Sequence, residues 1–437
     1  MINLKFNKQQ WEWIFYDWAN SGYGILVVTA VLPVYFKAAA HQNGISAALS
    51  TALWGYANSA GTLVVSLLAP FLGAMADYPY AKRRWLNWFA GLGIIMTMIL
   101  GALSPNAWQW LLIIYVLSAI GYSGGNLFYD SFLTDVADYR QIDALSATGY
   151  GMGYLGGVMA FLIFLTVELG HGFGWLNDYG IARFSFILAG LWWIIFGLPF
   201  LKNAHQRYSV PKEQKPIVAS FARVIKTMRH IRQYRAAFWF LVAYFFYIDG
   251  VDTIFTMATS IGSDMGIDTT MLMVVLLVVQ LIAFPFSIWY GWLANRTSTR
   301  RALLLGICVY LFICLQALHL KTLRDFWLLA VLVGTSQGGV QALSRSYFGK
   351  LIPKENSSEF FGFYNILGKF SAIIGPVLVG IVTQLTGEST KGAASLAVLF
   401  AVGLLIFLRL PAPSSLRAEG RHAVRHGLLQ RGLPRKP

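Results

Sequence analysis

Residues Gly73 to Arg84 read GAMADYPYAKRR, and residues Gly291 to Arg301 read GWLANRTSTRR. Each stretch begins with a glycine at the end of an apolar run, and four residues later it carries a carboxylate or an amide, Asp77 or Asn295. A turn and two or three cations come next. The second stretch is therefore an altered copy of the first, which predicts that the chain arose by duplication of a six-helix unit. Duplicated units embedded in a membrane are typical of transporters.

The composition predicts a membrane protein. Of 437 residues, 57% are apolar and only 12% are charged, whereas about 25% of the residues of a soluble domain are charged. Apolar stretches of about 18 to 25 residues recur, and each is long enough to cross about 30 Å of hydrocarbon as a helix. The predicted fold class is therefore an all-α membrane protein whose twelve transmembrane helices form two pseudo-symmetric six-helix bundles. The expected spans are about 14–36, 52–75, 86–104, 108–132, 146–168, 182–201, 237–261, 271–294, 302–319, 326–348, 360–384 and 393–410.

The net charge of +15 follows the membrane topology and does not indicate nucleic acid. Most cations fall in the loops expected on one side, and the loops of the other side keep only Lys37, Lys321, Arg324 and Lys391. Because cytoplasmic loops are enriched in lysine and arginine, this bias places both termini in the cytoplasm.

The chain divides into four predicted regions. Two six-helix bundles are expected at 1–201 and 237–410, joined by a basic cytoplasmic linker at 202–236, and a basic tail follows at 411–437. From about residue 217 the linker has the pattern of an amphipathic helix that could lie on anionic lipid headgroups, as a tether or as a regulatory docking site. The tail shows no apolar period, so it is expected to be disordered or loosely bound to the membrane surface.

Neither a cofactor, a metal site nor an enzyme is predicted. The two cysteines, Cys308 and Cys314, are six residues apart in one helix and are expected to be structural thiols. The stretch Gly362 to Phe370 approaches a phosphate-binding loop, but a phenylalanine stands where serine or threonine is needed. No region outside the helices is long enough for a catalytic domain.

Ionisable side chains inside the apolar stretches are costly to keep there and are functional candidates. Asp17 shares a helical stripe with Asn20, so the first helix should turn this stripe toward a polar cavity. Asp249 and Asp252 are three residues apart and near mid-bilayer in the seventh helix. Lys369 lies one turn after Asn365 in the eleventh helix and needs a counter-ion. Helix–helix contacts are the competing interpretation.

A second group of charges lies near the expected cytoplasmic face. The carboxylates there can reach water and pair with the arginines of the first loop. A role as a gate or lock and the absence of any functional role are therefore equally supported interpretations. The candidates for this lock are Asp77, Arg83, Arg84, Asp130, Asp135 and Arg345. Further on, Gly375 and Pro376 predict a kink in the eleventh helix, either a hinge or a fixed bend.

The paired loops and four longer stretches resemble the major facilitator superfamily, and within it the vacuole-effluxer branch named for a fungal autophagy-related amino-acid exporter. The four stretches are YDWANSGYG at 16–24, DGVDTI at 249–254, GGVQALSRSYFGKLIP at 338–353 and FFGFYNILGKFSAIIGP at 360–376. The resemblance implies alternating access and a pathway lined by helices one, four, seven and ten. It implies that Asp17, Asn20, Asp249, Asp252 and Gln341 face this cavity, and the bacterial members imply a place in the bacterial inner membrane.

The sequence departs from the superfamily pattern in both loops. Tyr78 to Ala81 replace the usual basic and glycine positions, and Asn295 stands where the second copy could carry an acid. The charge lock expected of the first loop would then depend on Asp77 alone.

The expected function is a proton-coupled transporter, by efflux, of a small polar metabolite such as an amino acid or related zwitterion. The paired acids and Lys369 suit both proton exchange and the two charges of a zwitterion. Efflux of a bulkier amphiphile such as a drug, siderophore or lipid-like compound is the alternative, and a non-transporting scaffold or sensor is a third. The expected partners are the substrate, protons and anionic lipids, and the expected assembly is a monomer.

Overall fold

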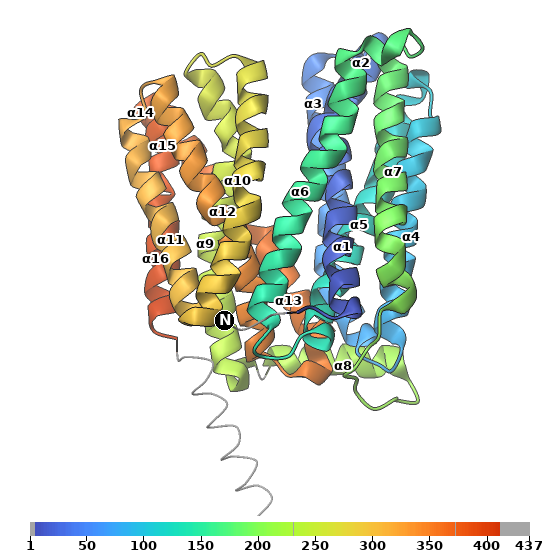
Figure 1. Cartoon of the computed structure of the whole chain (residues 1–437), viewed down its shortest axis with the longest axis vertical. Coiled ribbons are helices and arrows are strands. Elements are labelled where there is room, and N and C mark those ends of the chain that lie inside the picture. Colours follow the sequence, from blue (N-terminus) through green and yellow to red (C-terminus); the bar gives the residue numbers. More distant parts are fainter. Residues whose placement is uncertain (1–4, 230, 372, 411–437) are drawn as a thin grey trace, which may run out of the picture.

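The computed structural model describes residues 5–229, 231–371 and 373–410, and these ranges contain helices and no strand. Figure 1 shows the helices as two upright bundles that stand side by side. In the described ranges, twelve helices are long and apolar enough to cross a membrane, which agrees with the predicted number of spans. The predicted tail, 411–437, lies outside the described residues.

The first bundle contains the spans up to the linker. Its first span is a continuous run of three helical segments in which seven residues are π-helical, and it extends over Lys8–Gln42. It is therefore longer than the expected 14–36. The elements are α1 (Lys8–Tyr23), η1 (Gly24–Ala30), α2 (Leu32–Gln42), α3 (Ala47–Ala76), α4 (Ala81–Ala102), η2 (Pro105–Ala107), α5 (Trp108–Val136), α6 (Ile142–Leu169), η3 (His171–Gly174) and α7 (Asp178–Asn203).

The linker contains α8 (Pro216–Arg229) and the short η4 (Ile231–Tyr234). The second bundle then contains α9 (Arg235–Asp264), α10 (Thr269–Arg296), α11 (Thr299–Gln316), η5 (Ala317–His319), α12 (Leu323–Leu351), η6 (Lys354–Asn356), α13 (Ser357–Ser371), α14 (Ile374–Thr386), α15 (Ser389–Ser395) and α16 (Ala397–Leu408). In Figure 1, α8 lies across the lower end of the molecule. We call this the α8 end, and the opposite end the far end.

The eleventh span is interrupted, close to the predicted kink. Helix α13 ends at Ser371 and α14 begins at Ile374. Pro376 occupies the first turn of α14, where its missing N–H would have had no helical partner in any case. The interruption leaves the N–H groups at the start of α14 free to bind a side chain from another helix.

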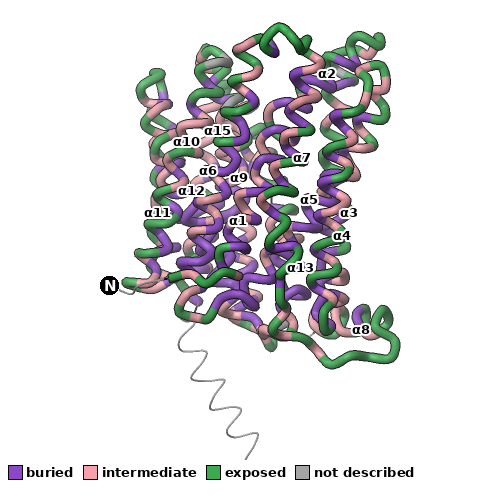
Figure 2. The backbone as a smooth tube through the Cα atoms, turned by 45° about the vertical axis from the view of Figure 1, so that its right-hand side comes forward, coloured by how far each residue is buried: buried purple, intermediate pink, exposed green. Residues whose placement is uncertain are grey.

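Figure 2 shows buried residues along the inner faces of the helices and exposed residues along α8 and the loops. Small residues allow the inner faces to approach closely. A Cβ atom on Gly121 of α5 would lie 2.2 Å from the backbone nitrogen of Gly93 in α4. Similarly, a Cβ atom on Gly156 of α6 would lie 2.6 Å from the backbone oxygen of Trp18 in α1. These contacts bring α5 close to α4, and α6 close to α1.

Candidate functional site

A cavity of about 380 Å³ lies between the two bundles, within the usual size range of sites for small molecules. Its lining is rich in hydroxyl, amide and charged groups. Helices α1, α5, α9 and α12, which are spans one, four, seven and ten, contribute to it, and so do α6, α10 and α13. The lining includes six tyrosines: Tyr122, Tyr129, Tyr150, Tyr154, Tyr244 and Tyr364.

Six of the seven residues predicted for substrate or proton binding line this cavity. They are Asp17, Asn20, Asp252, Gln341, Asn365 and Lys369. Asp252 and Lys369 carry opposite charges that attract each other, and among the described residues neither side chain has a hydrogen bond or an ion pair within 4.0 Å. The cavity therefore offers one carboxylate and one ammonium group to a ligand.

Asp249 does not line the cavity, contrary to the expectation from the resemblance. Its side chain is buried, and both carboxylate oxygens accept the backbone N–H of Gly375 at 2.9 Å. Thr253 donates its hydroxyl to the same carboxylate at 3.2 Å. Residues three apart on a helix point about 60° away from each other, so Asp252 can face the cavity while Asp249 faces α14. Asp249 thus caps the interrupted span.

Uncharged amides complete the cavity wall. The side-chain oxygens of Gln337 and Asn365 are buried and accept no hydrogen bond from the described residues. Gln341 accepts a hydrogen bond from Tyr154 Oη at 2.6 Å, and Asn20 donates to Asn126 at 2.5 Å. A buried amide oxygen without a donor costs free energy, so Gln337 and Asn365 point to a ligand that carries N–H or O–H groups.

Arg345 of α12 lies between the cavity and the α8 end. Its Nη1 donates to Asp130 Oδ1 at 2.7 Å, and its Nη2 lies 3.7 Å from Asp17 Oδ2. Nε donates to Ser146 Oγ at 3.0 Å, and the guanidinium lies over the ring of Tyr150. The cation comes from the second bundle, whereas both acids come from the first. The cluster therefore joins the two bundles at the floor of the cavity.

The first loop forms a second connection between the bundles. Asp77 is fully buried and accepts the backbone N–H groups of Ser358 at 2.9 Å and Glu359 at 3.1 Å. These groups belong to the first turn of α13, where N–H groups lack helical partners and favour a negative charge. Burial nevertheless raises the pKa of Asp77 to about 7. Lys82, the two N–H groups and Arg223 lower it, but burial has the larger effect.

Lys82, and not its neighbours Arg83 and Arg84, supplies the cation of this connection. Its buried ammonium group donates to Asp135 Oδ2 at 2.7 Å and to Ser357 Oγ at 2.8 Å. Arg83 instead donates to the backbone oxygen of Leu201, and Arg84 lies in an outer groove. The expected pairing of carboxylates with Arg83 or Arg84 is therefore wrong. The sequence does contain a signal for this choice, because Lys82 is the cation that lies on the apolar face of α4.

The second loop makes an equivalent connection with the roles of the two bundles exchanged. Asp143, at the start of α6, accepts from Thr299 Oγ1 at 2.7 Å, Ser346 Oγ at 2.7 Å and Lys350 Nζ at 2.5 Å. Asn295 makes no such contact, and its Nδ2 is buried without a described partner. Sequence reasoning did not select Asp143 because it lies outside both copies of the loop.

The two loop glycines lie at matching places in these connections. A Cβ atom on Gly73 would lie 2.1 Å from the backbone oxygen of Ser358, at the start of α13. A Cβ atom on Gly291 would lie 2.5 Å from Ala147 Cβ, near the start of α6. Each copy of the loop therefore packs against the other bundle, and only a glycine permits this approach.

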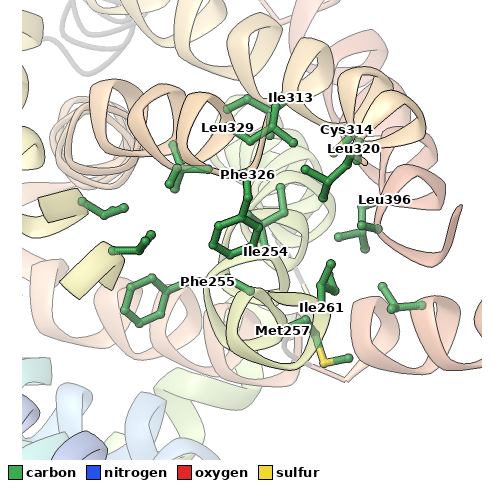
Figure 3. Close-up of a pocket in the computed structure, with 18 of the residues that line it drawn as sticks. Ile254, Phe255, Met257, Ile261, Ile313, Cys314, Leu320, Phe326, Leu329 and Leu396 are labelled. Atoms are coloured by element: carbon green, nitrogen blue, oxygen red, sulfur yellow. The ribbon is translucent and has the colours of Figure 1, made fainter. Parts of the chain in front are cut away.

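A second cavity, of about 90 Å³, lies wholly inside the second bundle. Figure 3 shows apolar side chains around it, among them Ile254, Phe326 and Leu396. Its lining contains no charged residue. A small apolar cavity of this kind holds neither water nor a polar substrate, so the cavity between the bundles is the candidate site.

Comparisons with known proteins agree with this geometry. The family described as "Vacuole effluxer Atg22 like" matches residues 48–420. The MFS-type transporter YxiO of Bacillus subtilis is 46% identical over 413 residues, which cover 94% of this chain and 96% of the relative. Autophagy-related protein 22 of Eremothecium gossypii is 24% identical and covers 87% of this chain and 86% of its own. A crystal structure of the Escherichia coli fucose:proton symporter superposes with a TM-score of 0.70 at 15% identity, covering 92% of this chain and 97% of that one.

Proposed function

Because the chain belongs to the Atg22-like vacuole effluxer family of the major facilitator superfamily, we propose that it exports a small zwitterion, such as an amino acid, in exchange for protons. The superfamily consists of transporters and not of enzymes, as the sequence predicted. The observation that carries the proposal is a pair of opposite charges on the cavity wall, Asp252 and Lys369, whose side chains make no hydrogen bond to the described residues.

The chemistry of the wall supports a zwitterion. Lys369 would bind a carboxylate, and Asp252 would bind an ammonium group together with the free oxygens of Gln337 and Asn365. Charge-assisted hydrogen bonds are about twice as strong as neutral ones, so two such contacts at fixed positions select a ligand with both charges. A polar lining of this kind disfavours the alternative cargo, a bulky amphiphile.

Alternating access is supported by where the two bundles are joined. Hydrogen bonds between them include those of Arg345 with Asp130, Ser346 with Asp143, and the start of α13 with Asp77, which lie from the cavity floor to the α8 end. Tyr154 also donates to Gln341 on the cavity wall itself. Figure 1 shows the bundles farther apart at the far end. We place the α8 end in the cytoplasm, with both termini, so that this arrangement opens outward.

In the opposite state the contacts at the α8 end would separate, and the cavity would open to the cytoplasm. Protonation of Asp17 or Asp130 would weaken their attraction to Arg345 and so favour that separation.

In this proposal the two bundles end and begin at residues 201 and 237, and the linker 202–236 lies on anionic headgroups. The chain would act as a monomer in the bacterial inner membrane. Alternating access fits these boundaries, because each bundle must move as a unit.

Binding by the purified protein tests the substrate class. We expect amino acids to bind, and their analogues that lack either the amino or the carboxyl group to bind at least about tenfold more weakly. Lys369→Gln should remove the preference for the carboxylate, and Asp252→Asn the preference for the amine. Lys391→Gln is a matched control because Lys391 pairs with Glu388 at the surface.

Counterflow in liposomes then tests transport and coupling. A pH gradient should drive uptake or release of the amino acid that binds, and Asp252→Asn should make exchange independent of pH. Binding of apolar cations with no competition by amino acids would instead favour the amphiphile. If deletion of α8 abolished function while cavity variants did not, a scaffold or sensor would be the better assignment.

A further inference from the structure

A groove of about 1370 Å³ runs along the outer side of α4 at the α8 end, away from the central cavity. One wall is a stripe of α4 that contains Arg84, Trp88, Gly91 and Ile95. These positions lie within about 60° of each other around the helix axis. The other wall includes Lys212 from the linker, so residues far apart in the sequence enclose the groove.

The α4 stripe changes in character from one end to the other. Arg84 lies at its α8 end, Trp88 one turn farther on is 75% exposed, and Ile95 about 16 Å beyond Arg84 is 56% exposed. Cation, tryptophan and aliphatic side chain in this order match the headgroup, the interface and the acyl chains of a bilayer. Gly91 lies between them, and a Cβ atom there would have nothing within 4 Å. The middle of the groove is therefore open.

Helix α8 indicates that the groove lies at the level of the headgroups. Its residues Ile217, Phe221 and Ile225 share one face and are 56%, 52% and 47% exposed. Phe221 also contacts Phe71 of α3, with ring centroids 4.0 Å apart, so this face continues the outer surface of α3. An amphipathic helix with its apolar face continuous with the outer surface of a span lies in the interface plane. Pro216, the first residue of α8, lines the groove.

The groove also touches the first loop. Tyr78 and Tyr80 line it, and they follow directly after Asp77, which accepts the N–H groups at the start of α13. The Tyr78 hydroxyl donates to the backbone oxygen of Pro216, and the guanidinium of Arg223 lies 5.3 Å from the Tyr78 ring centroid. Arg223 in turn donates to Glu359 Oε2 at 2.9 Å. A ligand in the groove would hold the loop in the conformation that joins the bundles.

We propose that this groove binds one anionic phospholipid, whose phosphate group lies between Arg84 and Lys212 and whose acyl chains lie against Trp88 and Ile95, and that this lipid favours closure of the α8 end. Charge complementarity and the open floor at Gly91 identify the occupant. The inference depends on α8 lying at a membrane surface, and it is independent of the substrate of the central cavity.

Native mass spectrometry of the full-length protein with added lipid tests the site. Phosphatidylglycerol should be retained in preference to phosphatidylcholine, and the double variant Arg84→Gln, Lys212→Gln should retain about thirtyfold less of it, the effect of two cations at an anionic surface. Gly91→Leu should exclude the lipid by filling the groove without changing any charge. Equal retention by these variants and the natural chain would overturn the proposal.

Matched variants separate the site from general effects. The pair Lys202→Gln, Arg409→Gln removes two exposed cations elsewhere, and Gly55→Leu fills open space on α3, so both should retain the lipid. Glycerol 3-phosphate has the headgroup charge without acyl chains and should not displace the lipid. Displacement by it would identify a site for a soluble phosphate and would contradict the proposal.

The effect on closure is measured by the distance between spin labels at Arg140 and Arg301, which are exposed at the α8 end of the first and second bundles. Replacing phosphatidylcholine by phosphatidylglycerol should increase the closed-to-open ratio about fivefold, an ordinary coupling between two sites. Gly91→Leu should abolish this increase. A ratio that responds equally in Gly91→Leu would show that the lipid acts elsewhere. None of these readouts requires transport, so their failure is distinct from failure of the proposed substrate.

Discussion

Arg345 of α12 donates from Nη1 to Asp130 Oδ1 of α5 at 2.7 Å, and this ion pair joins the two bundles directly below the cavity. The side chain of Arg345 is almost fully buried, with an exposed fraction of 2%. A buried cation that loses its partner is strongly destabilising, whereas a solvated one is not. The pair can therefore stabilise the closed α8 end only while both charges are present.

Arg345→Gln is expected to open the α8 end. The variant leaves Asp17 and Asp130 close together without a cation, which should destabilise the closed state by about 3 kcal/mol. The distance between spin labels at Arg140 and Arg301 should shift to longer values. Arg324→Gln makes the same chemical change at an exposed position and should leave the distribution unchanged. An unchanged distribution in Arg345→Gln would show that this cluster does not hold the closed state.

Gly73→Ala is expected to prevent full closure of the α8 end. The added Cβ atom would lie 2.1 Å from the backbone oxygen of Ser358, so α3 and α13 must move apart at a cost of about 1–3 kcal/mol. Gly55→Ala is the control, because this glycine is in the same helix and a Cβ atom there meets nothing within 4 Å. Ser131 is buried beside Ser358, so a cysteine placed there reports on closure. It should react faster with a soluble thiol reagent in Gly73→Ala than in the natural chain, and at an unchanged rate in Gly55→Ala.

Closure of the α8 end is expected to depend on pH through Asp77. In the closed state burial raises its pKa to about 7, whereas an open end would expose it and return its pKa toward the usual 3.8. The closed state then binds the proton more tightly. The stabilisation of the closed state is complete below about pH 4 and is lost as the pH rises through about 7, so the contribution of Asp77 to closure should grow as the pH falls from about 7 to about 4.

The variant Asp77→Asn cannot titrate and should remove this part of the pH dependence. The same spin-label pair measures it, and Lys82, Arg223 and Glu359 are the charged groups that face Asp77 or its connection. If closure of the natural chain and of Asp77→Asn depended on pH in the same way, the assignment to Asp77 would be wrong.

Asp249 and Asp252 are expected to differ in their effects on stability. Asp249→Ala removes the acceptor for the Gly375 N–H at the start of α14, so the free energy of unfolding should fall by about 1–2 kcal/mol and Tm with it. Asp252→Ala removes a carboxylate that makes no hydrogen bond to a described residue and interacts only through its charge with Lys369, so Tm should fall less. Thermal unfolding of both purified variants measures this, and equal losses of Tm would contradict the difference.

Much of the architecture follows from local properties of the sequence. Apolar stretches long enough to span the membrane predict twelve helices, because backbone groups in hydrocarbon must bond within a helix. The two loop copies predict the pairing of bundles, and the charges that are costly in hydrocarbon predict the cavity residues. Asp17, Asp252 and Lys369 all line the cavity for that reason.

The number of spans, the duplication and the side chains that need a polar environment thus follow from the sequence alone. The partners of those side chains depend on the three-dimensional packing: Asp249 bonds to α14 and does not face the cavity, Lys82 and not Arg83 pairs with Asp135, and Asp143 takes the place of an acid at Asn295. Helical periodicity gives the angle of a side chain about its own axis. The partner depends on how two helices rotate and cross, and that is settled by packing among residues distant in the sequence.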